Sequence, residues 1–398
     1  MLPEGADRGV IPIFAARACR GFADGFVAVL LPVYLLAMGL GGLEVGAIAT
    51  ATLLGSALAT LAIGAWGHRW TARALLLGAA IVMAATGLGF SLVSSFWPLL
   101  LLAFVGTLNP SSGDVSMFLP LEHARLAAGS DVAIRTELFA RYALAGAMCA
   151  ALGALASGLP DRLVTLIGIA RLDALRAMFI LYGLIGVIAW ISYRKLPENE
   201  ALSNTKPAPL GPSKAVVFRL AALFSVDSFA GGLVVNSLLA LWLFQRFGLS
   251  LSAAGVFFFA SGLLGAASQL AAPVLARRIG LVNTMVFTHI PASLCLIAAA
   301  FSTDVRWALS FLLVRALISS MDVPARSAFV MSVVQPQERA AAASFTAVPR
   351  SLASAASPLL AGWLFQSGWA AVPLVACGVL KIAYDLALWV AFRRSEVS

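Results

Sequence analysis

The sequence predicts an all-α protein that crosses a membrane repeatedly, with twelve helices arranged as two related halves. Of its 398 residues, 61% are hydrophobic and 11% are charged, and the mean hydropathy is +0.94. A soluble domain typically carries about 25% charged residues, because its surface faces water. The apolar residues also fall in runs of about 20, the length that a helix needs to cross a bilayer. These observations exclude a soluble globular protein.

Charged residues and turn formers mark the ends of the apolar runs, which is typical of membrane-spanning helices. The predicted spans cover residues 12–37, 44–66, 73–95, 97–114, 139–159, 174–193, 215–245, 252–275, 282–301, 306–323, 341–366 and 369–392. Most connections between them are short, so neighbouring spans should be antiparallel. A charged stretch, 160–173, is expected to hold a short interfacial helix before the sixth span.

The longest polar stretch runs from Arg194 to Lys214 and is rich in proline. Such a composition is typical of a linker. We therefore predict an N-terminal six-helix bundle over 1–193, a cytoplasmic linker over 194–214 and a C-terminal six-helix bundle over 215–398.

Lysine and arginine are distributed unevenly between the two predicted sides of the membrane. If the N terminus is cytoplasmic, most of them fall on the cytoplasmic side. The opposite side then holds Arg162, Arg171, Arg176, Arg246 and Arg306. Because positive loops stay in the cytoplasm, both termini are expected there. The first span is expected to be retained in a multi-pass protein of the inner or plasma membrane.

The second half of the sequence repeats features of the first half about 209 residues later. The matched pairs are Gly46 and Gly255, Arg69 and Arg278, Asp114 and Asp322, Arg141 and Arg350, and, at a slightly smaller separation, Asp24 and Asp227. An even number of helices in each half relates the halves by an axis along the membrane normal. This arrangement predicts a cavity between the halves near the middle of the bilayer, exposed alternately to each side.

The connections after the second and eighth spans carry a recognisable pattern. The first reads Gly64-Ala65-Trp66-Gly67-His68-Arg69-Trp70-Thr71-Ala72-Arg73, and the second reads Leu275-Ala276-Arg277-Arg278-Ile279-Gly280. They resemble the G-x-L-x-D-R-x-G-R-R loop of the major facilitator superfamily, and this resemblance covers essentially the whole chain. The usual acidic position holds His68 in one loop and Arg277 in the other, so the charge relay of that loop is altered here.

The resemblance implies a secondary transporter in which the first, fourth, seventh and tenth helices line the cavity. A substitute for the altered relay is a cytoplasmic gate of repeated acids and bases, closed when the protein faces outward. Its predicted members are Arg69, Arg73, Asp114, Arg141, Arg278, Asp322 and Arg350. The alternative is that these charges are simply solvated at the ends of helices.

Three charges fall inside spans that should line the cavity, namely Asp24, Asp227 and Arg315. An ionisable group at the bilayer centre costs at least about 2.5 kcal/mol, so it usually serves a function. Asp24 and Asp227 are predicted to carry the coupling proton. Asp24 could instead pair with Arg20, one turn earlier. Arg315 is predicted to bind an anion or to control a carboxylate, with Asp322 as the structural alternative.

Other polar groups within spans have two interpretations each. Asn109 and Asn236 are candidates for lining the substrate site, although such groups equally bond across helices. Lys381 and Asp385 are predicted to neutralise each other, because they lie four residues apart in the twelfth span. His289 is expected to be a satisfied core histidine.

Several classes of protein lack support in this sequence. The four cysteines and three histidines are widely separated, so no metal site is predicted. No phosphate-binding G-x-x-x-x-G-K-[ST] motif occurs, so neither a nucleotide nor another cofactor is expected. The basic residues, despite a net charge of +9, form no nucleic-acid patch.

We therefore expect a non-enzymatic, monomeric transporter whose partners are a small solute, a coupling proton and membrane lipid. Export of small apolar or amphipathic compounds is the main prediction, because the cavity helices appear poor in polar groups. The first alternative is proton-coupled uptake, or facilitated passage, of a small organic anion attracted by Arg315. A membrane scaffold or sensor without transport is the alternative of another class.

Overall fold

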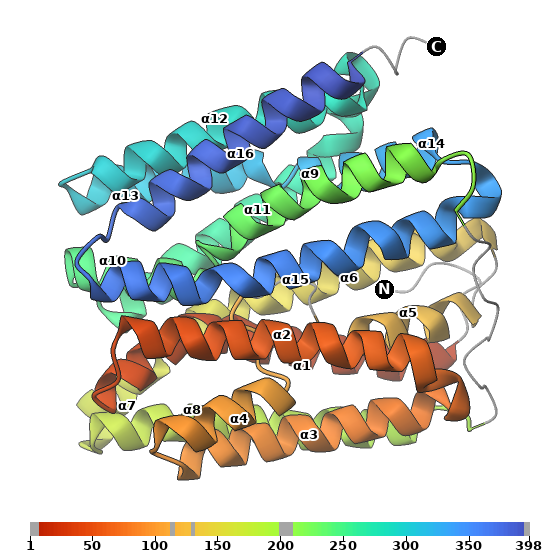
Figure 1. Cartoon of the computed structure of the whole chain (residues 1–398). Coiled ribbons are helices and arrows are strands. Elements are labelled where there is room, and N and C mark those ends of the chain that lie inside the picture. Colours follow the sequence, from red (N-terminus) through yellow and green to blue (C-terminus); the bar gives the residue numbers. More distant parts are fainter. Residues whose placement is uncertain (1–7, 112–115, 129–131, 199–209, 394–398) are drawn as a thin grey trace.

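A computed structural model describes residues 8–111, 116–128, 132–198 and 210–393. These residues form sixteen α-helices and three short 3-10 helices, without a β-strand. The long helices run side by side along one common direction (Figure 1). The predicted all-α class is therefore confirmed.

The helices follow the predicted spans closely in both halves of the chain. The first half contains η1 (Arg8–Val10), α1 (Ile11–Ala37), α2 (Gly42–Trp66), η2 (Gly67–Arg69), α3 (Ala72–Leu92), α4 (Phe96–Val105), α5 (Phe118–Ala128), α6 (Val132–Ala156), α7 (Leu159–Ile167) and α8 (Arg171–Arg194). The second half contains α9 (Lys214–Gly232), α10 (Asn236–Phe247), α11 (Leu251–Ile279), α12 (Leu281–Phe301), α13 (Val305–Ser319), α14 (Asp322–Val333), η3 (Pro336–Glu338), α15 (Arg339–Gln366) and α16 (Val372–Phe392). The short helix α7 lies where a short helix was expected within 160–173, and its interfacial position stays a prediction.

Ten helical segments of the described chain are long and apolar enough to cross a membrane. The apolar helix α4, with 10 residues, is shorter than these segments. Helix α15 has 28 residues and occupies the eleventh predicted place, as α4 occupies the fourth. The structure thus accommodates twelve spans, and the number twelve stays a prediction.

Three predicted spans are interrupted. The seventh is divided between α9 and α10, and the tenth is divided between α13 and α14 and continues to Val333. The fourth ends at Val105, and α5 begins further along the chain at Phe118. Two of these breaks coincide with glycine, since α9 ends at Gly232 and Gly106 follows α4. Glycine is disfavoured inside helices because it loses the most backbone entropy on folding.

Small residues allow helices within each half to approach closely. A Cβ atom added to Gly25 of α1 would lie 1.9 Å from the carbonyl oxygen of Ala150 in α6. A Cβ atom at Gly55 of α2 would similarly lie 1.7 Å from the carbonyl oxygen of Phe104 in α4. Such backbone contacts replace the bulky side-chain packing of soluble bundles, because lipid supplies little hydrophobic driving force between helices.

The two halves meet through α2 against α15, α6 against α11, and α1 against α10. Several of these contacts lie near the connections 38–41, 157–158, 248–250 and 367–371, which we call the sealed end. There the Leu43 amide donates to Gln366 Oε1 at 2.8 Å, and the Ser252 amide donates to Asp161 Oδ2 at 3.0 Å. The start of α1 and the end of α16 lie at the opposite end (Figure 1), which we call the terminal end.

Candidate functional site

A cavity of about 330 Å³ lies between the two halves. Its N-terminal wall consists mainly of small residues from α1 and α6. Its C-terminal wall carries polar side chains from α10, α11 and α13, namely Asn236, Ser261, Gln269, Arg315, Ser319 and Ser320. Binding sites for small molecules typically enclose about 300–1,000 Å³ and present a few convergent polar groups. This cavity therefore fits a small solute.

Arg315 is the charged residue in the cavity wall. Its structural alternative from the sequence, a pair with Asp322, is not formed, because Asp322 Oδ2 accepts from Arg326 Nη2 at 2.6 Å. Arg315 lies in α13, whereas Asp322 begins α14 beyond the break at Ser320. Among the described residues, Arg315 forms no ion pair or hydrogen bond, and its electrostatic interactions are with the thiols of Cys295 and Cys377.

The two predicted asparagines have different positions. Asn236 lines the cavity, and its Nδ2 donates to the carbonyl oxygen of Ser111 at 2.9 Å, so it also joins the halves. Asn109 is buried, receives hydrogen bonds from Ser111, and bonds the Asp24 side chain. Asn109 therefore supports Asp24 and is absent from the cavity wall.

Asp24 lies directly behind the cavity, because the next residue, Gly25, belongs to the wall. It is 8% exposed and interacts electrostatically with Arg20 and Arg17 as well as bonding Asn109. Arg20 makes its own ion pair with Glu122 of α5. The two interpretations of Asp24 from the sequence, proton carrier and partner of Arg20, both stay open.

Glu122 is the centre of a buried cluster in the N-terminal half that the sequence analysis missed. It is fully buried and accepts hydrogen bonds from Arg20, from Tyr142 of α6 and from Tyr193 of α8. Hydropathy placed 115–138 outside the spans because Glu122, His123 and Arg125 are polar. One signal was available: Glu122 follows Pro120 by two residues, just as Arg326 follows Pro324 in the other half.

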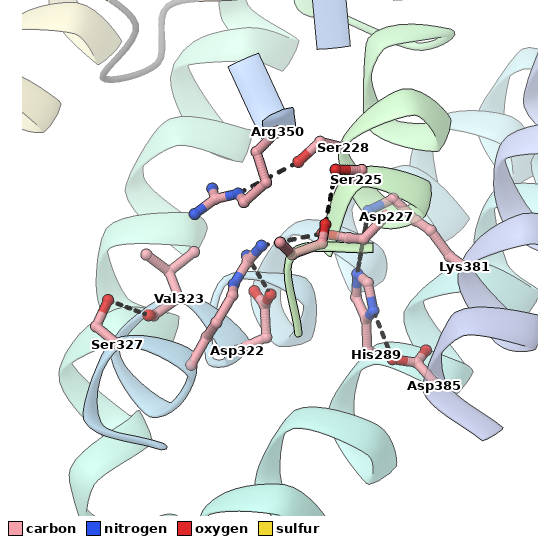
Figure 2. Close-up of polar contacts among 12 residues, drawn as sticks. Ser225, Asp227, Ser228, His289, Asp322, Val323, Ser327, Arg350, Lys381 and Asp385 are labelled. Carbon is pink, nitrogen blue, oxygen red and sulfur yellow. Dashed lines mark hydrogen bonds and ion pairs between the residues drawn. The ribbon is translucent and has the colours of Figure 1, made fainter. Parts of the chain in front are cut away.

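Asp227 of α9 lies in a buried network of charges within the C-terminal half (Figure 2). Its Oδ1 accepts from Lys381 Nζ at 2.6 Å, and its Oδ2 accepts from Arg326 Nη1 at 3.1 Å. Lys381 belongs to α16 and Arg326 to α14, so the network ties three helices together. Asp24 and Asp227 are related by the repeat, but their surroundings differ.

The network continues from Lys381 to His289 of α12 and on to Asp385 of α16. Lys381 Nζ lies 3.3 Å from His289 Nε2, and His289 Nδ1 lies 3.0 Å from Asp385 Oδ1 (Figure 2). The predicted pairing of Lys381 with Asp385 is therefore wrong. Acids and imidazoles on neighbouring helices compete with partners on the same helix, and in a buried site the partners on α9 and α12 prevail.

The predicted gate residues are distributed over both halves. Arg73 pairs with Glu198 and donates to the Arg194 carbonyl oxygen, Arg141 pairs with Glu137, and Arg350 Nε donates to Ser228 Oγ at 3.3 Å. Asp322 is bound to Arg326, as described above. Asp114 lies outside the described residues, and Arg278 belongs to the last turn of α11. The gate is defined for the outward-facing state, so it stays a prediction.

A larger groove of about 700 Å³ lies within the N-terminal half, away from the seam. It is formed mainly by apolar residues of α2 and α3, with Trp66, Arg69 and Trp70 at its rim. If volume alone were the criterion, this groove would be favoured as the solute-binding site over the cavity between the halves. The smaller cavity is the better candidate site, because it presents convergent polar groups and is lined by both halves.

Comparison with known proteins agrees with this architecture. A profile of the Major Facilitator Superfamily matches residues 13–321. An uncharacterized membrane protein of Saccharomyces cerevisiae, YJR124C, is 23% identical over 419 residues, which cover 96% of this chain and 94% of the yeast protein.

Solved transporter structures have the same fold. The nucleoside transporter NupG matches with a TM-score of 0.73 and 15% identity over 98% of this chain and 99% of that chain. A bacterial homolog of the human lysosomal transporter Spinster, inward-facing and occupied, matches with a TM-score of 0.75 and 14% identity over 96% of both chains. The D-xylose-proton symporter matches with a TM-score of 0.72 and 16% identity over 96% of this chain and 97% of that chain. The protein is therefore a multi-pass membrane transporter that belongs to the Major Facilitator Superfamily.

Proposed function

We propose that this protein moves a small, negatively charged solute across the membrane by alternating access, coupled to protons. The observation that carries the proposal is the Arg315 guanidinium in the wall of the cavity between the halves. A charge held within a membrane protein is costly, so it is retained where a counter-charge arrives. Arginine suits this task because its planar group bonds a carboxylate or phosphate through two parallel hydrogen bonds.

The surrounding side chains support a polar cargo. Asn236 and Gln269 can each donate to and accept from a solute, and three serine hydroxyls add further donors and acceptors. The structural neighbours include transporters described as acting on nucleosides and on D-xylose, both of which are small polar molecules. The prediction of an apolar cargo was based on the small number of polar groups in the cavity helices, whereas the cavity wall presents six polar side chains, which favour a polar cargo.

Alternating access is supported by the positions of the contacts between the halves. Gly46 of α2 packs against Gly362 of α15, and the Leu359 amide donates to Thr50 Oγ1 at 3.0 Å, both toward the sealed end. The cavity wall extends from Ala154, near the sealed end of α6, to Gln269 and Ser320, which lie further from that end along the chain. The solute site thus lies next to contacts that must separate if the halves are to open at the sealed end.

Export of amphipathic compounds is a second candidate, and the apolar groove between α2 and α3 favours it. That groove has room for a larger apolar molecule, and Arg69 at its rim could hold an anionic group. The direction of transport does not depend on which of these solutes is carried, and export is the direction that we expect from the sequence.

Flux measurements in proteoliposomes test the proposal. The purified protein is reconstituted with an imposed pH gradient, and a radiolabelled panel of small carboxylates, phosphate esters, nucleosides, sugars and lipophilic cations is supplied. We expect a carboxylate or phosphate ester to move, with a direction relative to the proton flow that separates antiport from symport. Movement of the lipophilic compounds alone would favour the second candidate.

A matched pair of substitutions within α13 tests the role of Arg315. Arg315→Gln removes the charge in the cavity wall. Arg306→Gln removes an exposed charge in the first turn of the same helix, outside the cavity wall. We expect Arg315→Gln to lower anion flux at least about tenfold, which corresponds to about 1.4 kcal/mol, and Arg306→Gln to leave it unchanged. Equal flux in the two variants would refute the proposal that Arg315 binds the solute.

A further inference from the structure

His289, in the middle of α12, is the centre of a chain of hydrogen bonds that the proposed solute site does not use. On one side it contacts Asp385, and on the other it contacts Lys381, which is itself bound to Asp227. The His289 side chain is 6% exposed and Asp385 is completely buried. Ionisable groups at this depth require a reason beyond packing.

The partners of His289 determine which ring nitrogen carries the proton. A charged lysine offers only donors, so the contact between Lys381 Nζ and His289 Nε2 requires Nε2 to accept. Nδ1 then carries the hydrogen and donates it to Asp385 Oδ1 at 3.0 Å. In this arrangement the imidazole is neutral and its hydrogen-bonding capacity is fully used.

Asp385 lacks a full set of partners. Its Oδ2 atom is buried and has no hydrogen-bond partner among the described residues. Among the described residues the network contains three carboxylates, Asp227, Asp322 and Asp385, and two directly bonded cations, Lys381 and Arg326. Arg350 adds a third positive charge, which interacts with Asp227 and Asp322. None of these three cations bonds Asp385, whose hydrogen-bond partner is His289, so a positive charge on the imidazole would stabilise the Asp385 carboxylate.

We infer that the coupling proton binds at the His289–Asp385 pair and that its arrival transfers Asp227 from Lys381 to His289. This inference rests on the proposed proton-coupled transport and assigns its proton site. A proton from water adds to Nε2 and gives an imidazolium, whose Nδ1–H still donates to Asp385. The new Nε2–H has an acceptor nearby, since Asp227 Oδ1 lies 3.9 Å from Nε2.

Protonation of His289 Nε2 removes the acceptor to which Lys381 Nζ donates, and it places a positively charged imidazolium beside the Lys381 ammonium group. Lys381 must then withdraw from His289 and from the shared Asp227 oxygen. Lys381 Nζ lies 3.9 Å from the position of a Cβ atom on Gly231, one residue before the end of α9. The break between α9 and α10 follows, and α10 carries Asn236 into the cavity and packs against α1. Protonation of His289 therefore acts next to the break between α9 and α10, and α10 contacts the N-terminal half through α1.

Every charged or titratable group around His289 bears on this switch. α9 contributes Asp227, α14 contributes Asp322 and Arg326, and α16 contributes Lys381, Asp385 and Tyr384, whose ring packs edge-on against the imidazole at 6.2 Å between centroids. Arg350 of α15 interacts electrostatically with Asp227 and Asp322, and Arg315 of α13 interacts with Cys295 and Cys377. The basic residues of α11 lie in its last turn, at the terminal end.

The test is a titration of the histidines by ¹⁵N NMR in the full-length protein in lipid nanodiscs. The chain has three histidines, so the signals of His68, His123 and His289 can be assigned by replacing each with glutamine. We expect His289 to be the neutral Nδ1–H tautomer at the high-pH end of the range titrated and to become an imidazolium toward its low-pH end.

Two variants with opposite expected effects test whether Asp385 and Lys381 control the protonation of His289. Asp385→Asn removes the carboxylate that stabilises the imidazolium, and should reduce the imidazolium signal at a given pH. Lys381→Met removes a neighbouring cation, and should increase the imidazolium signal at the same pH. His68→Gln, which alters an exposed loop residue, should leave the His289 signal unchanged.

The inference is overturned if His289 keeps one neutral tautomer throughout this range, or if neither variant changes its imidazolium signal. If Asp385→Asn does not fold, Lys381→Met carries the test by itself. The titration needs no transported solute, so a failure of the proposed transport would leave it measurable. Conversely, if His289 stayed unprotonated, the flux measurements could still show solute transport, and only the assignment of the proton site would fail.

Discussion

At the scale of single residues, the buried charges of this transporter are held by partners from other helices. The repeat identified Asp24 and Asp227 as related positions, but it gave no information about what surrounds them. Asp227 has two direct cations, whereas Asp24 has a neighbouring arginine that is itself bound to Glu122. Spacing along a helix suggested a pair between Lys381 and Asp385, and each side chain bonds to another helix.

Glu122 should be essential for the stability of the N-terminal half. Glu122→Gln would leave Arg20 buried with a weakened partner, and removing one member of a buried ion pair costs about 3–5 kcal/mol. The measurement is equilibrium unfolding in mixed micelles. Glu137→Gln is the control, because the Glu137–Arg141 pair is solvent-exposed and contributes about 0–1 kcal/mol. Similar losses in both variants would contradict this role of Glu122.

Glu338, in the connection before α15, should stabilise the start of α9 in a pH-dependent way. Hydrogen bonds from Ser213 and from the Gly211 amide hold the pKa of Glu338 below its ordinary value of 4.5. A lowered pKa means that the contribution to stability is present above this value and is lost as the pH falls. Glu338→Gln, which resembles the protonated acid, should therefore speed amide exchange at Gly211 and Ser213 at neutral pH.

The same comparison at acidic pH provides the control for Glu338. At a pH well below the lowered pKa of Glu338, wild type and Glu338→Gln should exchange at similar rates, because both then carry a neutral side chain. A difference that persists unchanged into acid would show that the charge of Glu338 is not responsible.

At the scale of helices, hydropathy predicted most boundaries to within a few residues. It failed where a span is interrupted or continues through polar sequence. The fourth span illustrates this, because Glu122, His123 and Arg125 made the sequence of α5 resemble a loop. Polar residues are tolerated in a membrane helix when neighbouring helices bury and pair them, and such neighbours cannot be seen in a hydropathy profile.

Gly46 should determine how closely α2 approaches α15. A Cβ atom there would lie 2.4 Å from the Pro358 carbonyl oxygen and 2.9 Å from the Gly362 Cα atom. Gly46→Leu should force the halves apart at the sealed end. Overpacking of this kind costs about 1–3 kcal/mol, which corresponds to a shift of about 5–150-fold toward the state open at that end.

The shift can be measured as the labelling rate of Asn236→Cys by a membrane-impermeant maleimide, in a background without the native cysteines. Gly64→Leu is the matched control in the same helix, because a Cβ atom at Gly64 has no neighbour within 4 Å. Equal labelling of Gly46→Leu and Gly64→Leu would show that the α2–α15 contact does not control opening.

At the scale of the whole molecule, the two halves form a cavity that neither half contains alone. The N-terminal half supplies a wall of small residues, and the C-terminal half supplies the polar groups and Arg315. The repeat predicted a cavity between halves, and the structure has one. Arg315 and Asn236 were predicted to line it, but the serines of its wall were not, because hydropathy averages over all faces of a helix and the cavity wall is formed by one face.

A cross-link at the sealed end should stop transport. A Cβ atom on Gly42 would lie 3.3 Å from the Phe365 Cβ atom, close to the separation of about 3.5–4.5 Å in disulfides. Gly42→Cys with Phe365→Cys, in a background without the native cysteines, should lose flux on oxidation and regain it on reduction. Each single cysteine variant is a control that should be insensitive to oxidation. Undiminished flux in the oxidised double variant would contradict alternating access at this contact.

The sequence by itself determined the membrane location, the helical class, the approximate spans and the relation between the halves. These properties follow from apolar length and from repetition, which are both linear features of a chain. The tertiary structure alone decided which charges meet, where helices break, and that Asp322 binds Arg326 instead of Arg315. The physical reason is that a buried charge takes the nearest partner in space, and in a helical bundle that partner often belongs to another helix.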